Sequence, residues 1–193
     1  MEFIQHKPLQ GLHAPFSASQ SHWLRYDDEK VAEVYLNKKA AAMGSRLHEW
    51  AKETIDLGLK QDTRKKTTLN MYINDAIGFK MSTEVVLFYS ERFFGTADAI
   101  CYRNEKGKNV LRIHDLKTGK TGKIEDHIEQ LEVYAALFCL EYKIKPSEID
   151  MELRIYQNDE ILCHNATAND VEPVMETIIH LNKLLENAEY EEG

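Results

Sequence analysis

The sequence has few cysteines and no long apolar run. Its three cysteines, Cys101, Cys139 and Cys163, are odd in number and widely spaced, so they favour neither a disulfide framework nor a four-cysteine metal cluster within one chain. No run of about 18 apolar residues is present, which argues against a membrane-spanning helix. The N-terminus also lacks the charged and then apolar pattern of a leader peptide. We therefore expect a cytoplasmic protein without a membrane partner.

Three motifs of common enzyme classes are also absent. The sequence has no G-x-G-x-x-G, no G-x-x-x-x-G-K-[ST] and no G-x-S-x-G. These absences argue against a dinucleotide-binding fold, a P-loop and the nucleophile elbow of a hydrolase.

The composition is that of a folded domain. Hydrophobic residues make up 43% and charged residues 29% of the 193 residues, which argues against disorder. We predict a single domain over 1–193, with an extended arm at 1–16 and an acidic tail at 188–193. The net charge of −8 is unlike that of a general nucleic-acid-coating protein.

Periodicity, capping residues and turn signals predict the order of the elements. Strands are expected over 82–90, 94–102, 111–117, 151–157 and 160–166. Helices are expected over 17–26, 28–39 and 40–57 (separate or fused), 68–78, 125–143, and from 169 or 170 onward. This order predicts an α/β fold with a mixed central sheet flanked by helices, not the regular alternation of a doubly wound parallel sheet.

Acidic side chains occur in two neighbouring predicted strands. Alternation along the first strand (Phe94, Thr96, Asp98, Ile100, Tyr102) places Asp98 among apolar neighbours. The same period along the second strand places Asp115 beside Lys117. Acids on an apolar face must be paired, hydrated or bound to a cation. Two interpretations follow: a Mg²⁺ or Mn²⁺ site with oxygen ligands, or an ion pair between Lys117 and one of the acids.

Basic residues are concentrated around these acids. Seven lysines and arginines lie between positions 101 and 123, against only Glu105 and Asp115. Such a basic strip could contact the phosphates of a nucleic acid. Its members are Arg103, Lys106, Lys108, Arg112, Lys117, Lys120 and Lys123.

Four short motifs resemble the RecB-like branch of the PD-(D/E)XK nucleases, and in particular its small phage exonucleases. They are GSRLH at 44–48, GTAD at 95–98, DLKTG at 115–119 and QLEVY at 130–134. They occur in the order typical of that family, and the segment HAPFSASQSHWLRY at 13–26 is similar to the N-terminal segment of phage members. The resemblance covers about residues 13 to 142. It implies a restriction-endonuclease-like core of order αβββαβ.

The resemblance implies a role for each matching residue. The metal ligands would be His48, Asp98, Asp115 and the backbone carbonyl of Leu116, while Lys117 would position the attacking water and offset charge in the transition state. Catalytic roles fall to Asp98, Asp115, Lys117, Gln130 and Tyr134. The DNA contacts would be Ser19, Thr118, Lys120 and Lys123.

The implied function is that of a Mg²⁺- or Mn²⁺-dependent deoxyribonuclease, with one or two ions and no iron–sulfur cluster. It would be an exonuclease that acts on phage or prophage DNA in the bacterial host cytoplasm. Its expected partners are DNA and a single-strand annealing or recombination protein, and it could form an oligomer. The alternatives are a flap or junction endonuclease, an RNA nuclease, or a non-catalytic subunit that binds DNA ends.

Several residues keep a second interpretation. His48 alone on an amphipathic helix is commonly a boundary histidine, and Gln130 with Tyr134 could be an ordinary helix edge. Glu84, on the first strand, could join the site or remain solvated. Glu49 and Glu53 would reach the metal only if their helix were rotated.

Overall fold

The structure is a computed structural model that describes residues 14–18, 20–119 and 123–191. The chain divides into two compact units, Met1–Arg46 and Leu47–Gly193, with the boundary inside helix α1 (Asp28–Asp56). The single domain over 1–193 stays a prediction.

The first unit contains a 3-10 helix, Ser21–Arg25, and the N-terminal part of α1. Asp27 caps α1, because its carboxylate accepts a 2.8 Å hydrogen bond from the backbone N–H of Lys30. The predicted helices 28–39 and 40–57 are fused into one helix of 29 residues. The sequence KKAAA at 38–42 favours helix and contains no glycine or proline, so nothing ends the helix there.

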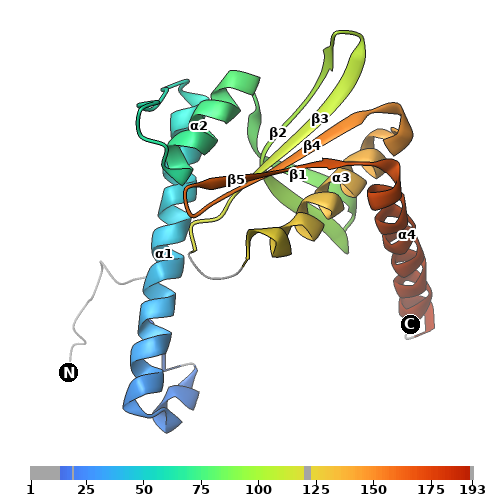
Figure 1. Cartoon of the computed structure of the whole chain (residues 1–193). Helices are drawn as coiled ribbons and strands as arrows, with labels where there is room; N and C mark the ends of the chain where they lie inside the picture. The colour runs from blue at the N-terminus through green and yellow to red at the C-terminus, as the bar shows by residue number, and fades with distance from the viewer. Residues whose placement is uncertain (1–13, 19, 120–122, 192–193) are drawn as a thin grey trace, which may run out of the picture. The chain divides into compact units, whose positions relative to one another are not determined.

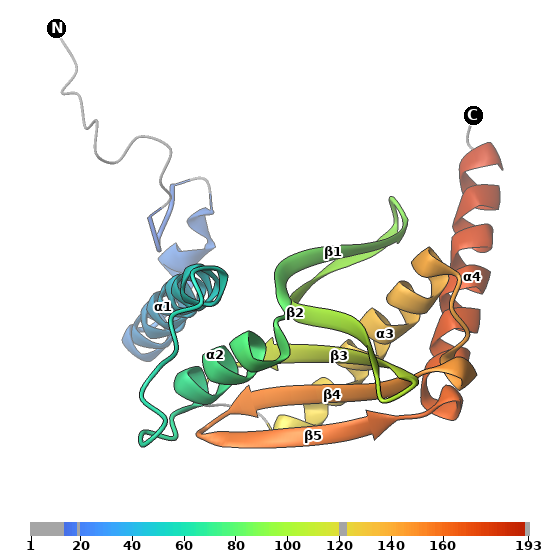
Figure 2. The ribbon, with the colours of Figure 1, turned by 90° about the horizontal axis from the view of Figure 1, so that it is seen from above.

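The second unit is built on a five-stranded sheet of order β1-β2-β3-β4-β5 (Figures 1 and 2). β3 and β4 are parallel, and the other neighbouring strands are antiparallel. The predicted mixed α/β sheet with flanking helices is therefore confirmed. The elements, in chain order, are α2 (Thr68–Phe79), β1 (Ser82–Ser90), β2 (Phe93–Glu105), β3 (Lys108–Leu116), α3 (Ile128–Tyr142), β4 (Asp150–Gln157), β5 (Glu160–Ala166) and α4 (Ala168–Glu191).

Two-residue turns close both hairpins where they were predicted. Lys106 and Gly107 join β2 to β3 with φ of 52° and 89°, and Asn158 and Asp159 join β4 to β5 with φ of 51° and 61°. Positive φ at both central residues matches the twist of the flanking strands.

α2 continues past Gly78, the glycine expected to end it. Lys80 ends the helix instead, in the left-handed conformation with φ of 51°. The N–H of Met81 then bonds the carbonyl of Ala76 at 2.9 Å, and the Met81 side chain enters the core. This hydrogen bond satisfies the last helical turn without a glycine.

Helices cover both faces of the sheet, with α2 on one side and α3 on the other (Figure 1). The core on the α3 side includes Leu111, Ile113 and Val171 of α4. The core on the α2 side includes Ile55 from the end of α1 and Leu116. None of the helices in the described ranges has the length and apolar composition that crossing a membrane requires. α4 continues to Glu191, into the segment predicted as an acidic tail.

In β1 and β2, the alternation of side chains between the two faces of the sheet is interrupted at Glu84 and Asp98. Ala97 and Ile100 both belong to the core under α3, although they are three residues apart. The alternation predicted for residues 94 to 102 therefore does not hold through the whole strand. Opposite Asp98, Glu84 has φ of 51°, a left-handed conformation that costs a non-glycine residue about 1–2 kcal/mol.

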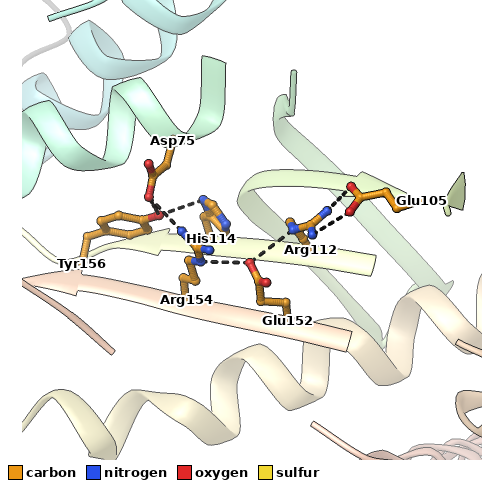
Figure 3. Close-up of polar contacts among 7 residues, drawn as sticks. All are labelled: Asp75, Glu105, Arg112, His114, Glu152, Arg154 and Tyr156. Atoms are coloured by element: carbon orange, nitrogen blue, oxygen red, sulfur yellow. Dashed lines mark hydrogen bonds and ion pairs between the residues drawn. The ribbon is translucent and has the colours of Figure 1, made fainter. Parts of the chain in front are cut away.

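A chain of polar contacts attaches α2 to β4 and β3 (Figure 3). The carboxylate of Asp75 accepts hydrogen bonds from Arg154 at 2.9 Å and from the Tyr156 hydroxyl at 2.8 Å. That hydroxyl lies 3.1 Å from Nδ1 of His114, which is fully buried. Burial, followed by the charges of Arg154 and Arg112, lowers the pKa of His114 to about 3. The imidazole is therefore neutral at physiological pH.

The contacts continue from Arg154 through Glu152 to Arg112 and Glu105 (Figure 3). Both guanidinium groups also lie over the ring of Phe79, at 4.4 Å for Arg112 and 5.0 Å for Arg154. Arg112 was expected in a basic strip that meets nucleic acid. It is instead buried, paired with two carboxylates and stacked on a ring.

We expect Asp75→Ala to lower the free energy of unfolding by about 2 kcal/mol, because it removes a hydrogen-bonded partner of a guanidinium that is mostly buried. Urea unfolding measures this loss. The matched control is Asp62→Ala, which removes the carboxylate paired with Arg64, whose side chain is 90% exposed. An exposed pair of this kind contributes about 0–1 kcal/mol. Equal losses in the two variants would show that the Asp75 contacts add no stability.

Candidate metal and catalytic site

The candidate site lies at the end of the β2–β3 hairpin away from its turn. Asp98 of β2 is central there, since its Oδ2 accepts a 2.9 Å hydrogen bond from the backbone N–H of Leu116 on β3. The same oxygen lies 3.5 Å from Nδ1 of His48 on α1. One carboxylate therefore holds α1, β2 and β3 together. The structure brings together His48 and Asp98, the two residues that the resemblance implies as metal ligands, and that role stays a prediction.

Glu84 of β1 completes a cluster that could hold a metal ion. One ligand-capable atom each from His48, Glu84 and Asp98 lies within 4.8 Å of the others. The sequence left the role of Glu84 open, and its only signal was an acid within an apolar strand. Glu49 and Glu53, the other acids considered, lie exposed on α1 and do not belong to this cluster.

Asp115, Lys117, Gln130 and Tyr134 form a second group beside the first. The Lys117 ammonium donates to Oε1 of Gln130 at 2.8 Å and lies 2.9 Å from Oδ2 of Asp115. Nε2 of Gln130 donates to Oδ1 of Asp115 at 3.3 Å and to the Tyr134 hydroxyl at 3.2 Å. The predicted edge of α3 thus supports both the acid and the lysine.

The carboxyl group of Asp115 is buried within this group. Burial, followed by the negative charge of Asp98, raises its pKa, while Lys117 acts in the opposite direction. Oδ2 of Asp115 is buried and accepts no hydrogen bond of good geometry, although the Lys117 ammonium lies 2.9 Å away. Burial of this carboxylate carries a cost that a further cation beside it would reduce.

The pKa of His48 is raised as well, which for an imidazole favours the charged form. Its hydrogen bond to Asp98 raises the pKa of the imidazole, against the effect of burial, and the charges of Asp115 and Glu84 raise it further. The imidazole is held by acids on several sides. A cation that replaces the proton would relieve the same excess of negative charge.

The predicted DNA-contacting residues are only partly described. Thr118 lies beside Lys117 in the lining of a pocket of about 250 Å³. Lys123 is exposed at the start of the 3-10 turn Ile124–His127. Ser19 and Lys120 lie outside the described residues, so their DNA contacts stay predictions.

The predicted basic strip does not border the acids as a unit. Lys106 lies at the hairpin turn, eight residues from Asp98, and Lys108 lies opposite Glu105, seven residues from Asp98, so both are about 25 Å from it at the rise of a strand. Lys108 also pairs with Asp150 at 3.5 Å. Among the members of the strip that lie in the described ranges, only Lys117 takes part in the hydrogen bonds and ion pairs of the candidate site.

Gly95, in the GTAD motif, provides space for Tyr134. A Cβ atom at this position would lie 2.8 Å from Cε1 of the Tyr134 ring, too close for two carbon atoms. The glycine therefore allows α3 to place Tyr134, and through it Gln130, against β2. The sequence predicted the motif but not this packing reason.

We expect Gly95→Ala to displace the Tyr134 ring, to lower the free energy of unfolding by about 1–3 kcal/mol, and to weaken any activity that depends on Gln130. Gly78→Ala is the matched control. It adds the same methyl group inside α2, where nothing lies within 4 Å, and should stabilise by about 0.5–1 kcal/mol. Thermal unfolding of both variants provides the measurement. A stabilised Gly95→Ala protein would contradict the close packing of Tyr134.

The donor set suits a small divalent cation. One imidazole and two carboxylates match Mn²⁺ or Mg²⁺, and the buried Asp115 lies close enough to them for the charges of Asp98 and His48 to shift its pKa. No protein-family model matches the chain, and no curated protein or solved structure is significantly similar to it. The resemblance to PD-(D/E)XK nucleases therefore rests on the four motifs, and the ligand role of the Leu116 carbonyl stays a prediction.

Proposed function

We propose that this protein is a divalent-metal-dependent nuclease of the PD-(D/E)XK type that hydrolyses phosphodiester bonds in DNA. One observation supports the proposal most directly. The cluster of His48, Glu84 and Asp98 lies next to a buried acid–lysine pair, Asp115 and Lys117, across the ends of two adjacent strands. A site that only bound DNA would have no use for three carboxylates facing phosphate.

The residues of the site would divide the work. His48, Glu84, Asp98 and Asp115 would hold the cation, which when bound supplies Lewis-acid polarisation of the scissile phosphate. Lys117 is held in place by Gln130, so its ammonium would stabilise the negative charge that develops on the phosphoryl oxygens. Gln130 would in turn fix the orientation of both charged groups.

The order of elements also supports this proposal. A helix precedes β1, β2 and β3, and α3 then leads to β4 parallel to β3, which is the arrangement expected of the restriction-endonuclease-like core. Exonuclease action and a role in phage recombination rest on the sequence motifs alone. Flap, junction or RNA cleavage by the same site would need the same cation and the same lysine.

The direct test uses end-labelled single-stranded DNA, double-stranded DNA and RNA with Mg²⁺, Mn²⁺ or EDTA. We expect cleavage of DNA that requires the metal, and Mn²⁺ binding that calorimetry detects. Asp98→Asn, purified in the same way, controls for a contaminating nuclease and should lose both. The His48 ligand should favour Mn²⁺ over Mg²⁺ at low metal concentration.

Each result has a distinct meaning. Cleavage of RNA alone would move the substrate to RNA and keep the chemistry. DNA binding without cleavage at any metal concentration would favour a non-catalytic subunit. Absence of both Mn²⁺ binding and cleavage would overturn the proposal.

A further inference from the structure

An exposed apolar surface covers one face of β1 and β2. Phe88 pairs with Phe94 across the two strands, and Val86 pairs with Thr96. The side chains of Phe88, Phe94 and Val86 are 44%, 60% and 54% exposed. The two rings lie 6.5 Å apart at an angle of 31°. We call these four residues the aromatic platform.

The aromatic platform is continuous with the candidate metal cluster. Counting by two along β1 leads from Phe88 through Val86 to Glu84, and the same count along β2 leads from Phe94 to Asp98. The opposite face of the same stretch is filled by Leu87, which is 1% exposed in the core under α3. The rings and the acids of the candidate metal cluster therefore share one face of the hairpin, about 13 Å apart along the strand.

The edge of β1 is closed to strand addition at this place. The backbone N–H of Phe88 donates to the carboxylate of Glu141 at 2.9 Å, and the pairing of β1 with β2 is irregular between Phe88 and Ser90. A charged side chain on an edge strand and an irregular register both prevent pairing with another chain. A partner would have to contact the face of the platform instead of its edge.

The platform is also small for a protein partner. Three partly exposed side chains fall well below the area of about 800 Å² per partner that a stable protein interface buries. Two open aromatic rings next to a site for phosphodiester cleavage suit flat ligands, because nucleobases of any sequence stack on aromatic side chains.

We propose that Phe88 and Phe94, with Val86 and Thr96, stack nucleobases of the strand whose backbone enters the metal cluster. This inference rests on the proposed nuclease function and specifies how that site would hold its substrate. It predicts a preference for unpaired bases at this position, since paired bases do not expose their faces.

The test compares two fluorescent oligomers with equal phosphate charge, a 20-nucleotide polythymidine and a 20-unit abasic chain. Binding is measured by anisotropy in Ca²⁺ and again in EDTA. We expect wild-type protein to bind polythymidine more tightly than the abasic chain. Phe88→Ala combined with Phe94→Ala should weaken polythymidine binding about tenfold or more per stacked base and leave abasic binding unchanged.

Two matched variants sharpen the result. Leu181→Ala with Leu184→Ala removes apolar side chains that are 39% and 52% exposed on α4, and should change neither affinity. Phe88→Leu with Phe94→Leu keeps an apolar face without π-systems. This variant should bind polythymidine almost as weakly as the alanine variant does. Full binding by the leucine variant would show apolar contact in place of stacking.

Several outcomes would contradict the proposal that the aromatic platform stacks nucleobases. They are equal binding of both oligomers by wild-type protein, no binding of either, equal loss on both in the alanine variant, and a wild-type dimer that the alanine variant dissociates in light scattering. Metal-dependent cleavage with equal binding of both oligomers would contradict base stacking and support the nuclease function. Base-dependent binding without cleavage would support base stacking and contradict the nuclease function.

Discussion

Lys117→Ala is expected to keep Mn²⁺ and DNA binding and to lose the chemical step by about two to four orders of magnitude, as for a group that acts mainly in the transition state. The Lys117 ammonium already has a fixed position, because Gln130 accepts its hydrogen bond at 2.8 Å and Asp115 lies 2.9 Å away. Such a preorganised cation stabilises developing charge without having to reorient. Single-turnover cleavage at saturating metal measures the loss.

Two further variants separate charge from position. Lys117→Arg keeps the charge but should not restore the rate, since a planar guanidinium cannot occupy the place of an ammonium between Asp115 and Gln130. Lys123→Ala removes an exposed lysine of the following turn and should change the single-turnover rate little. A near-normal rate for Lys117→Ala would make this lysine a structural partner of Asp115.

Much of the framework follows from local sequence signals. The hairpin turns at Lys106 and Asn158 and the stop at Gly58 (φ of 68°) lie where turn chemistry predicted them. These features depend on the conformational preferences of one or two residues. The contact of Gln130 with Tyr134 was similarly available from helical spacing, because residues four apart share a helix edge.

The parts that could not be predicted depend on contacts distant in the sequence. Glu84, in the candidate metal cluster, has a left-handed backbone conformation with φ of 51°, and no propensity scale favours that for glutamate. The sequence placed Arg112 in a strip that could contact DNA, whereas in the structure Glu152 of β4 forms an ion pair with it. The position of Arg112 thus depends on a strand that lies 40 residues later in the chain.

The alternation along β2 failed for a related reason. A period of two assumes a regular strand, whereas β1 and β2 change faces at Glu84 and Asp98. Alternation holds from Phe94 to Asp98 and breaks after Asp98, so that Ile100 returns to the core that Ala97 also enters. Departures from regular geometry of this kind are commonly concentrated at functional sites.

Asp115→Asn should abolish cleavage and, in EDTA, raise the melting temperature of the protein. The carboxylate is 3% exposed, Oδ2 lacks a hydrogen-bond partner, and burial together with the charge of Asp98 raises its pKa. An acid whose pKa is raised by folding costs stability when it is ionised, so the cost is present above its folded pKa. Asparagine removes that charge and keeps an oxygen that can accept the hydrogen bond from Gln130.

The pH dependence of the melting temperature tests whether the ionised carboxylate of Asp115 lowers the stability of the protein. The gain from Asp115→Asn should be largest at alkaline pH and shrink as the pH falls through the raised pKa, because the wild-type carboxyl then binds a proton and loses its charge. Asp56→Asn is a control of opposite sign. Hydrogen bonds from Lys52 and Thr83 lower the pKa of Asp56, so its stabilising contribution is present above the unfolded pKa and is lost as the pH falls. If Asp115→Asn destabilised the metal-free protein as Asp56→Asn does, Asp115 would be a satisfied structural acid and its assignment as a metal ligand would fail.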